Sequence, residues 1–182
     1  MRKVNWDNVQ EKGGFTPITP GGYVAAITKV EDHEDKQYLR IYWDFVEEPY
    51  RGSNARTYQE KGYWPMWFPR SYKEANLGYF KSFKTQLEKS NPGYHFQEDR
   101  LQDLSRKYIG VVLRPEEYIA NDGAVKVRNT VYQTRSVDAI RAGNFTVPEL
   151  KKLYGNSVPD TQTDNSGFQE LTDEDVDGEL PF

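Results

Sequence analysis

Residues 37–46 alternate apolar and polar side chains more clearly than the rest of the chain, which predicts a β-strand with one buried face. Its inward positions would be Leu39, Ile41, Trp43 and Phe45. Its outward positions would be Tyr38, Arg40, Tyr42 and Asp44. A strand of this kind needs neighbouring strands and a core, so the rest of the chain is interpreted around it.

Four further strands and one helix are expected. The strands are predicted over residues 23–30, around 54–58, over 108–114 and over 124–135. The helix is predicted over residues 72–89, with an apolar face made by Leu77, Phe80, Phe83 and Leu87. This order predicts an all-β domain with one helix: an OB-fold, a five-stranded Greek-key barrel with the helix between strands 3 and 4. A ferredoxin-like fold is excluded, because the turn over residues 31–36 is too short for the helix it requires there.

The 182 residues suit one domain with extensions at both ends. Residues 1–20 are expected to be a loose N-terminal segment, since glycines and prolines interrupt their few apolar positions. The OB-fold domain is expected over residues 21–154. Residues 155–182 are polar and without apolar periodicity, so a disordered acidic tail is predicted there.

The net charge of −4 combines two unlike parts of the chain. Residues 156–182 contain eight acidic and no basic residues, whereas residues 1–155 carry 24 basic and 20 acidic residues, a difference of +4. A mildly basic domain with a strongly acidic tail indicates contact with nucleic acid or an interaction tail.

Rings alternate with cations on the outward faces of two predicted strands. The second strand would present Tyr38, Arg40 and Tyr42, and the fifth would present Lys126, Arg128 and Tyr132. Bases of unpaired DNA stack on aromatic rings while Lys and Arg follow the phosphates, so these residues are candidates for single-strand binding. The competing interpretation is that they are ordinary half-exposed strand residues.

The segment Tyr63–Arg70 contains two prolines, which argue against a helix or a central strand. It is either a lid over the open end of the barrel or an aromatic arm that stacks bases. Arg56, Lys61 and Arg70 favour contact with DNA, and the candidate binding residues are Arg56, Trp64 and Trp67. Trp43 is expected in the core, because it shares the inward phase of its strand, and Phe80 and Phe83 are expected to pack rather than bind.

Enzyme chemistry is not indicated by the sequence. The chain has no Cys and two His, and it lacks a phosphate-binding glycine loop and a Gly-x-Ser-x-Gly motif. His33 lies in an acidic run that is interpreted as a solvated turn, and His95 is interpreted as structural. No cofactor and no metal are therefore expected.

The chain also has no apolar run that could span a membrane and no secretory signal, so no membrane contact and a cytoplasmic location are expected.

The acidic tail ends in three residues that a merely solubilising tail does not need, Leu180, Pro181 and Phe182. They follow the acidic residues Asp173, Glu174, Asp175, Asp177 and Glu179. We expect this tip to be a tethered ligand, with Phe182 entering a pocket of a partner protein and the acids steering it to a basic surface.

This ending resembles the acidic C-terminal tips of bacterial single-stranded DNA-binding proteins. Over residues 15–140 the body is similar to OB-fold single-strand binders of phages and prophages, through residues 21–27, 39–45 and 108–110. The resemblance implies a homo-oligomeric protein that coats transiently exposed single strands, in the host cytoplasm if it is phage-encoded. It also implies that the tip recruits enzymes of replication, recombination and repair.

The predicted function is therefore sequence-independent binding of single-stranded DNA in phage or prophage replication, recombination or repair. The alternative is an OB-fold adaptor of phage replication or recombination that does not itself bind DNA, which the modest charge of +4 keeps open. An enzyme such as a small nuclease ranks third.

Overall fold

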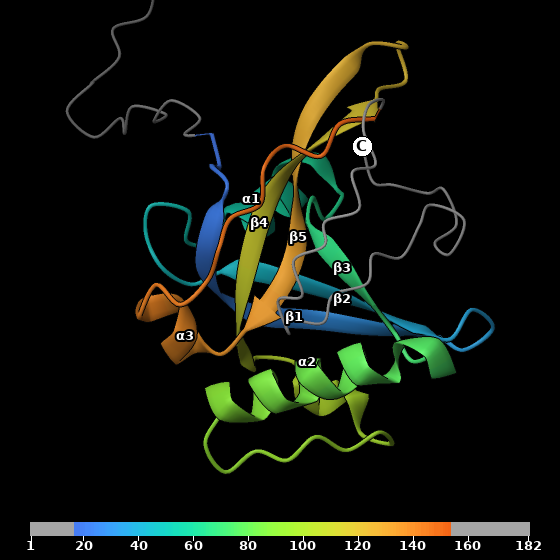
Figure 1. Ribbon diagram of the computed structural model, residues 1–182, viewed down its shortest axis with the longest axis vertical. Helices are drawn as coiled ribbons and strands as arrows, with labels where there is room; N and C mark the ends of the chain where they lie inside the picture. Colours follow the sequence, from blue (N-terminus) through green and yellow to red (C-terminus); the bar gives the residue numbers. More distant parts are fainter. Residues whose placement is uncertain (1–16, 154–182) are drawn as a thin grey trace, which may run out of the picture.

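Five antiparallel strands form one sheet in the order β3-β2-β1-β4-β5 in the computed structural model, which describes residues 17–153 (Figure 1). The strands are β1 (Gly21–His33), β2 (Tyr38–Phe45), β3 (Trp67–Ser71), β4 (Tyr108–Ile119) and β5 (Val125–Arg135). The prediction of a mostly-β domain with five strands is confirmed. Residues 1–16 of the predicted N-terminal segment and the predicted tail over residues 155–182 lie outside the described residues.

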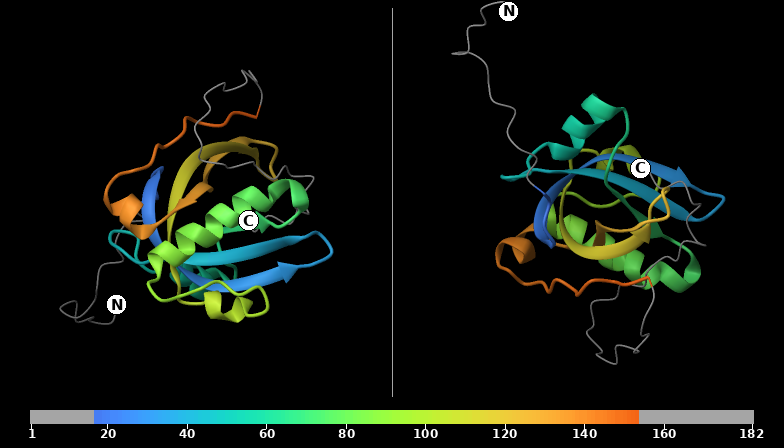
Figure 2. Two further views of the ribbon diagram at one scale, coloured as in Figure 1. Left: turned by 60° about the horizontal axis from the view of Figure 1, so that its bottom comes forward. Right: turned by 90° about the horizontal axis from the view of Figure 1, so that it is seen from above.

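The prediction of a single helix is wrong, because residues 17–153 contain three α-helices. They are α1 (Ser53–Lys61), α2 (Leu77–Ser90) and α3 (Val137–Arg141), with short 3-10 helices at η1 (Glu74–Asn76) and η2 (Leu101–Leu104). Along the chain, α2 follows β3 and precedes β4. In space, α2 lies across one end of the sheet and the β4–β5 hairpin extends from the other, while α1 and α2 lie on opposite sides (Figures 1 and 2).

The third strand lies elsewhere than predicted. Residues 54–58 belong to α1, and the strand is β3, which pairs with β2 through the proline-containing segment. β3 is at the end of the strand order, and an edge strand tolerates Pro69 because one side of its backbone has no ladder partner.

The start of α1 is fixed by a residue from the neighbouring strand. Asp44 accepts hydrogen bonds from the backbone N–H groups of Asn54 and Ala55, both at 3.0 Å. Asn54 donates in turn from Nδ2 to the Trp43 carbonyl at 2.9 Å. The first N–H groups of a helix have no partner within the helix, so the Asp44 carboxylate stabilises α1 from outside its own sequence.

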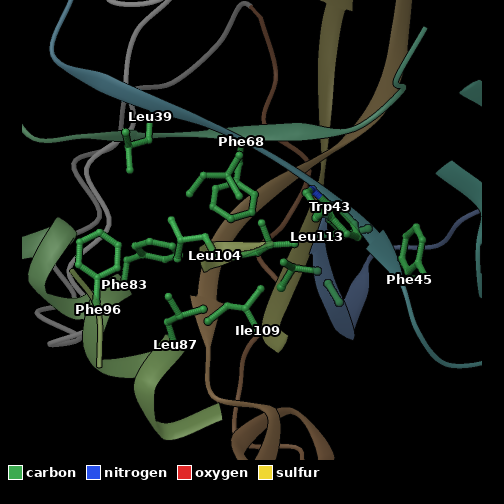
Figure 3. Packing of buried hydrophobic residues seen from close by; sticks show 14 of the residues in the cluster. Leu39, Trp43, Phe45, Phe68, Phe83, Leu87, Phe96, Leu104, Ile109 and Leu113 are labelled. Carbon is green, nitrogen blue, oxygen red and sulfur yellow. The ribbon is translucent and has the colours of Figure 1, made fainter. Parts of the chain in front are cut away.

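The core lies between the inner face of the sheet and α2. Trp43 and Ile41 are fully buried, and the prediction that Trp43 belongs to the core is confirmed. Figure 3 shows Phe83 and Leu87 of α2 facing the cluster that contains Phe68 of β3 and Ile109 of β4. The predicted packing roles of Phe80 and Phe83 are confirmed as well.

Leu77 differs from its predicted place on the buried face of the helix, since it is 50% exposed. It is the first residue of α2, and helical side chains lean toward the N-terminus. Its side chain therefore reaches past the part of the helix that is packed on the sheet.

A smaller cluster lies on the outer face of the sheet, where α3 packs through Val137 and Ile140 onto Val24 and Val112. After α3 the chain returns to the β4–β5 hairpin. There the Glu117 amide donates to the Lys151 carbonyl at 2.8 Å, and the Lys151 amide donates to the Pro115 carbonyl at 3.0 Å. Among the helices of residues 17–153, none has the length and apolar character needed to cross a membrane.

Candidate nucleic-acid interface

The outer face of β1, β2 and β3 gathers rings and cations at one level of the sheet. Tyr42 of β2 pairs with Lys29 of β1 on one side and with Trp67 of β3 on the other. Directly opposed residues in an antiparallel ladder project to the same side, so these three side chains are neighbours. Together with Arg40, Tyr58 and Trp64 they form what we call the aromatic cluster, made of Lys29, Arg40, Tyr42, Tyr58, Trp64 and Trp67.

Arg40 and Trp67 form a stacked pair across the β2–β3 ladder. The guanidinium carbon of Arg40 lies 4.5 Å from the centroid of the Trp67 ring. Both residues are half-buried. One side of the ring is thus occupied by a cation, an arrangement that fixes the ring in place.

Tyr42 is held by a carboxylate that also binds Lys29. The Tyr42 hydroxyl donates to Glu31 Oε2 at 2.9 Å, and Lys29 Nζ lies 2.5 Å from Glu31 Oε1. Burial acts to raise the pKa of Glu31, but the hydrogen bonds from Lys29 and Tyr42 outweigh it and lower that pKa from its ordinary value. The ionised carboxylate of Glu31 therefore borders the aromatic cluster and orients both a ring and a cation of it.

Tyr58 and Trp64 reach the aromatic cluster from α1 and the segment after it. Trp64 donates from Nε1 to the Trp43 carbonyl at 3.0 Å, and its ring centroid lies 5.8 Å from that of Tyr58. Tyr58 is 52% exposed. Neither a lid nor an arm describes this segment, because Trp64 is tied to β2 and Trp67 is part of β3.

Two of the arginines expected to contact DNA point elsewhere. Arg56 donates from Nη2 to the Arg51 carbonyl at 3.2 Å, next to its own helix. Arg70 is only 6% exposed, with its guanidinium 4.6 Å from the Phe68 ring centroid and its Nη2 3.2 Å from Thr134 Oγ1 of β5. Residues of β3 alternate in direction, so Trp67 faces outward and Arg70 inward. Burial lowers the pKa of Arg70 to about 9, which leaves the guanidinium charged at neutral pH.

The prediction that Tyr38 is exposed on the outer face is wrong. Tyr38 is 2% exposed, and its ring stacks on the His33 ring with centroids 4.6 Å apart and planes 1° from parallel. His33 is the directly paired residue at the end of β1, so the neighbouring strand covers the ring. The Tyr38 hydroxyl accepts from Arg40 Nη2 at 3.3 Å and so supports the cluster without contributing an open ring.

The predicted residues of the fifth strand lie on the β4–β5 hairpin, where each has a partner. Lys126 pairs with Asp122 at 2.8 Å. The guanidinium carbon of Arg128 lies 5.0 Å from the Tyr118 ring centroid, and that of Arg114 lies 5.2 Å from the Tyr132 ring centroid. We call this second set the hairpin cluster; it consists of Arg114, Tyr118, Lys126, Arg128 and Tyr132.

The opposite face of the hairpin also differs from the prediction. Val125, Val127 and Val131 alternate with the residues predicted to face outward and so should face the core, but only Val131 packs against it. Val125 and Val127 are 55% and 57% exposed, next to Ile119 at 54%. The hairpin extends beyond the core (Figure 1), so within residues 17–153 the inward side chains at the end of β5 stay exposed.

Lys29 and Tyr58 are members of the aromatic cluster that the sequence patterns did not identify. Lys29 follows a bulge in β1 between Ile27 and Lys29, which shifts the register that alternation assumes. Tyr58 was assigned to a strand instead of a helix. The predicted partner-binding residues of the tip, residues 173–182, lie outside the described residues.

The arrangement offers half-exposed rings, neighbouring cations and fixed geometry. Within residues 17–153, no group of three or more His, Asp or Glu side chains could hold a metal ion. Rings and cations of this kind suit a ligand with aromatic faces and negative charge. Comparison of the chain with protein-family models gives no match, and comparison with curated proteins gives none either.

Proposed function

We propose that this protein binds single-stranded DNA without sequence specificity. The observation that supports this most directly is the aromatic cluster, in which Tyr42 and Trp67 lie beside Arg40 and Lys29 on one face of the sheet. Duplex DNA hides its base faces, whereas unpaired bases can stack on these rings while the cations contact phosphates. The cluster contains no pattern of donors and acceptors that would select one base.

We further propose that the five strands form an OB-type barrel. In support, β3 and β5 stand at the two ends of the strand order, and the side chains of Arg70 and Thr134 meet across the gap between them. The binding face of such a barrel is that of strands 2 and 3, which is where the aromatic cluster lies.

The acidic C-terminal segment would provide a second function, the binding of partner proteins. Residues 156–182 carry a charge of −8 and finish in Leu180-Pro181-Phe182, and we propose that this tip recruits proteins of phage or prophage replication, recombination or repair. In the absence of DNA the acidic residues would compete for the basic face, and bound DNA would release the tip. A homo-oligomer acting in the cytoplasm is part of the same proposal.

A second candidate, an adaptor that does not bind DNA, is favoured by the apolar side of the hairpin. Ile119, Val125 and Val127 are more than half exposed and lie on one face of the paired strands. Apolar side chains gathered in this way suit a protein partner better than a nucleic acid.

A titration with fluorescent oligothymidine, compared with a duplex of the same length over a range of salt concentrations, separates the two functions. A DNA-binding protein should prefer the single strand at every salt concentration, and Tyr42→Ala or Tyr132→Ala should weaken binding without lowering the melting temperature appreciably. Single-strand binding that is absent, or equal to duplex binding and unchanged in both variants, would favour the adaptor.

A further inference from the structure

A hollow of about 460 Å³ lies between the end of α2 and the start of β4, formed by residues 90–94 and 106–108. An exposed ring and two cations surround it. Tyr108 is 49% exposed, Arg106 is exposed, and Lys107 Nζ lies 4.6 Å from the centroid of the Tyr94 ring. We call these four residues, Tyr94, Arg106, Lys107 and Tyr108, the Tyr108 site.

The backbone of Tyr108 is held rigidly although it has no strand partner on one side. Asn91 Oδ1 accepts from the Tyr108 amide and Asn91 Nδ2 donates to the Tyr108 carbonyl, both at 2.8 Å. Asn91 Nδ2 also donates to the Leu87 carbonyl at 2.7 Å, which ties the arrangement to α2. The ring of Tyr108 is thus presented to solvent from a fixed position, which lowers the ordering cost of binding a ligand.

The groups of the hollow that suit a phosphate are its two cations, Arg106 and Lys107. Within the described residues, the Tyr94 hydroxyl is buried and has no hydrogen-bond partner. Burial raises the pKa of Tyr94, and Asp103 and Glu88 raise it further, so the hydroxyl stays protonated at neutral pH. Arg106 adopts a left-handed backbone conformation with φ of 67°, an uncommon one for a residue with a side chain.

Tyr108 lies on the same face of the sheet as the aromatic cluster, whereas Tyr94 packs against the core. Ala26 of β1 pairs with Tyr108 on one side and with Asp44 of β2 on the other, and Tyr42 shares the outward phase of Asp44. β1 alone separates β2 from β4, so two strand spacings, about 10 Å, lie between the two sets of residues across the sheet.

Hydrogen bonds join the two regions directly at the bulge of β1. The Arg106 amide donates to the Ile27 carbonyl at 2.7 Å, and the Ile27 amide donates to the Lys107 carbonyl at 2.8 Å. Ser105 Oγ donates to the Thr28 carbonyl at 3.2 Å. Lys29 of the aromatic cluster directly follows Thr28 in β1, so basic side chains lie on both sides of these hydrogen bonds.

We infer that the Tyr108 site is a second contact for the same DNA strand, which crosses from β3 over β2 and β1 to the hollow at the end of α2. The Tyr108 ring would stack a base, and Arg106 and Lys107 would bind the adjoining phosphates. This inference rests on the proposed function, because the strand must first occupy the aromatic cluster. It adds that the binding path runs across the strands and extends beyond β2 and β3.

The test uses the full chain and oligothymidines of increasing length. A short oligonucleotide that fills only the aromatic cluster should bind wild type, Tyr108→Ala and Lys107→Ala equally. A longer one should bind wild type more tightly, and each variant should lose at least about fivefold of affinity for it, as expected for the loss of one stacked base or phosphate contact. Tyr108→Phe keeps the ring and should bind like wild type.

Lys81→Ala removes an exposed lysine from the middle of α2 and is the matched charge control. It should leave affinity unchanged at every length. If wild type binds single-stranded DNA but Tyr108→Ala and Lys107→Ala match it at all lengths, the Tyr108 site is not part of the path. If wild type binds no oligonucleotide, the proposed function itself fails, and the two failures are therefore distinguishable.

Discussion

The Arg40 guanidinium stacks on the Trp67 ring at 4.5 Å and so links β2 to β3 through side chains as well as through the ladder. The pair should contribute to stability in the absence of any ligand, by about 0.5–1 kcal/mol. Urea denaturation of wild type, Arg40→Ala, Trp67→Ala and the double variant measures this as a coupling free energy. Additive effects of the two substitutions would show that the stack contributes nothing.

Trp43→Ala should destabilise the domain by about 3–5 kcal/mol, because it removes a fully buried ring from the centre of the core. Tyr42→Ala, at the preceding position of the same strand, removes a half-buried ring from the outer face and should lower the free energy of unfolding much less. Thermal or chemical denaturation compares the two directly. Similar losses in both variants would contradict the assignment of inner and outer faces.

Asp44→Ala should destabilise α1 selectively, by about 1–3 kcal/mol, because two helix N–H groups and the Phe45 amide would lose their acceptor. Trp64 and Tyr58 should become more exposed, which tryptophan fluorescence and acrylamide quenching report. Asp44→Asn keeps one acceptor oxygen and serves as the milder comparison. An unchanged quenching profile in Asp44→Ala would show that α1 holds without the carboxylate.

Glu31 predicts a pH dependence in the acid range. Its pKa is lowered in the folded protein from an ordinary value of 4.5, so the folded state favours the carboxylate. Its stabilising contribution should be fully present above pH 4.5 and should be lost as the pH falls through the lower folded-state pKa. The stability difference between wild type and Glu31→Gln should therefore shrink on acidification, and a difference that is constant with pH would contradict this.

Removal of residues 173–182 takes away five acidic side chains and the apolar end. If the tail competes with DNA for the basic face, the truncated protein should bind oligothymidine more tightly than the full chain, and most strongly so at low salt. It should also lose binding to proteins recruited through the tip. A truncated protein with unchanged DNA affinity and unchanged partner binding would refute the tail's role.

Alternation in the sequence predicted the faces of β2 well, because both of its neighbours are strands and its inner side meets α2. The same pattern failed in β5. Val125 and Val127 alternate as regularly as Leu39 and Ile41 do, but the hairpin extends beyond the core and leaves them exposed. Periodicity identifies two faces of a strand without showing whether anything covers them.

The helix at residues 53–61 was missed because its stabilisation comes partly from outside the segment. A local signal was present, since Ala55, Gln59, Glu60 and Lys61 are good helix formers between Gly52 and Gly62. Both glycines have positive φ values, 69° and 79°, as helix boundaries often do. The position of Asp44 beside the first turn depends on how the chain folds and could not be derived from spacing.

The candidate site was predicted in part. Arg40, Tyr42 and Trp67 do lie together, with Trp67 in an edge strand that the two prolines permit but that was not predicted. The predicted exposure of Tyr38 was wrong because the His33 ring of the neighbouring strand covers it. The predicted DNA contact of Arg70 was wrong because the face on which its side chain lies depends on where β3 begins. Each of these errors concerns a neighbour or a register, which a single strand's pattern does not contain.

The hydrogen bonds of Asp44 have an electrostatic consequence for the face on which it lies. Its negative charge is directed into three backbone amides and away from the solvent above β1 and β2. A polyanion passing between Tyr42 and Tyr108 would therefore meet little repulsion from an acid that stands almost in its way. The residue that orders a helix thus also keeps its own negative charge away from the surface between Tyr42 and Tyr108.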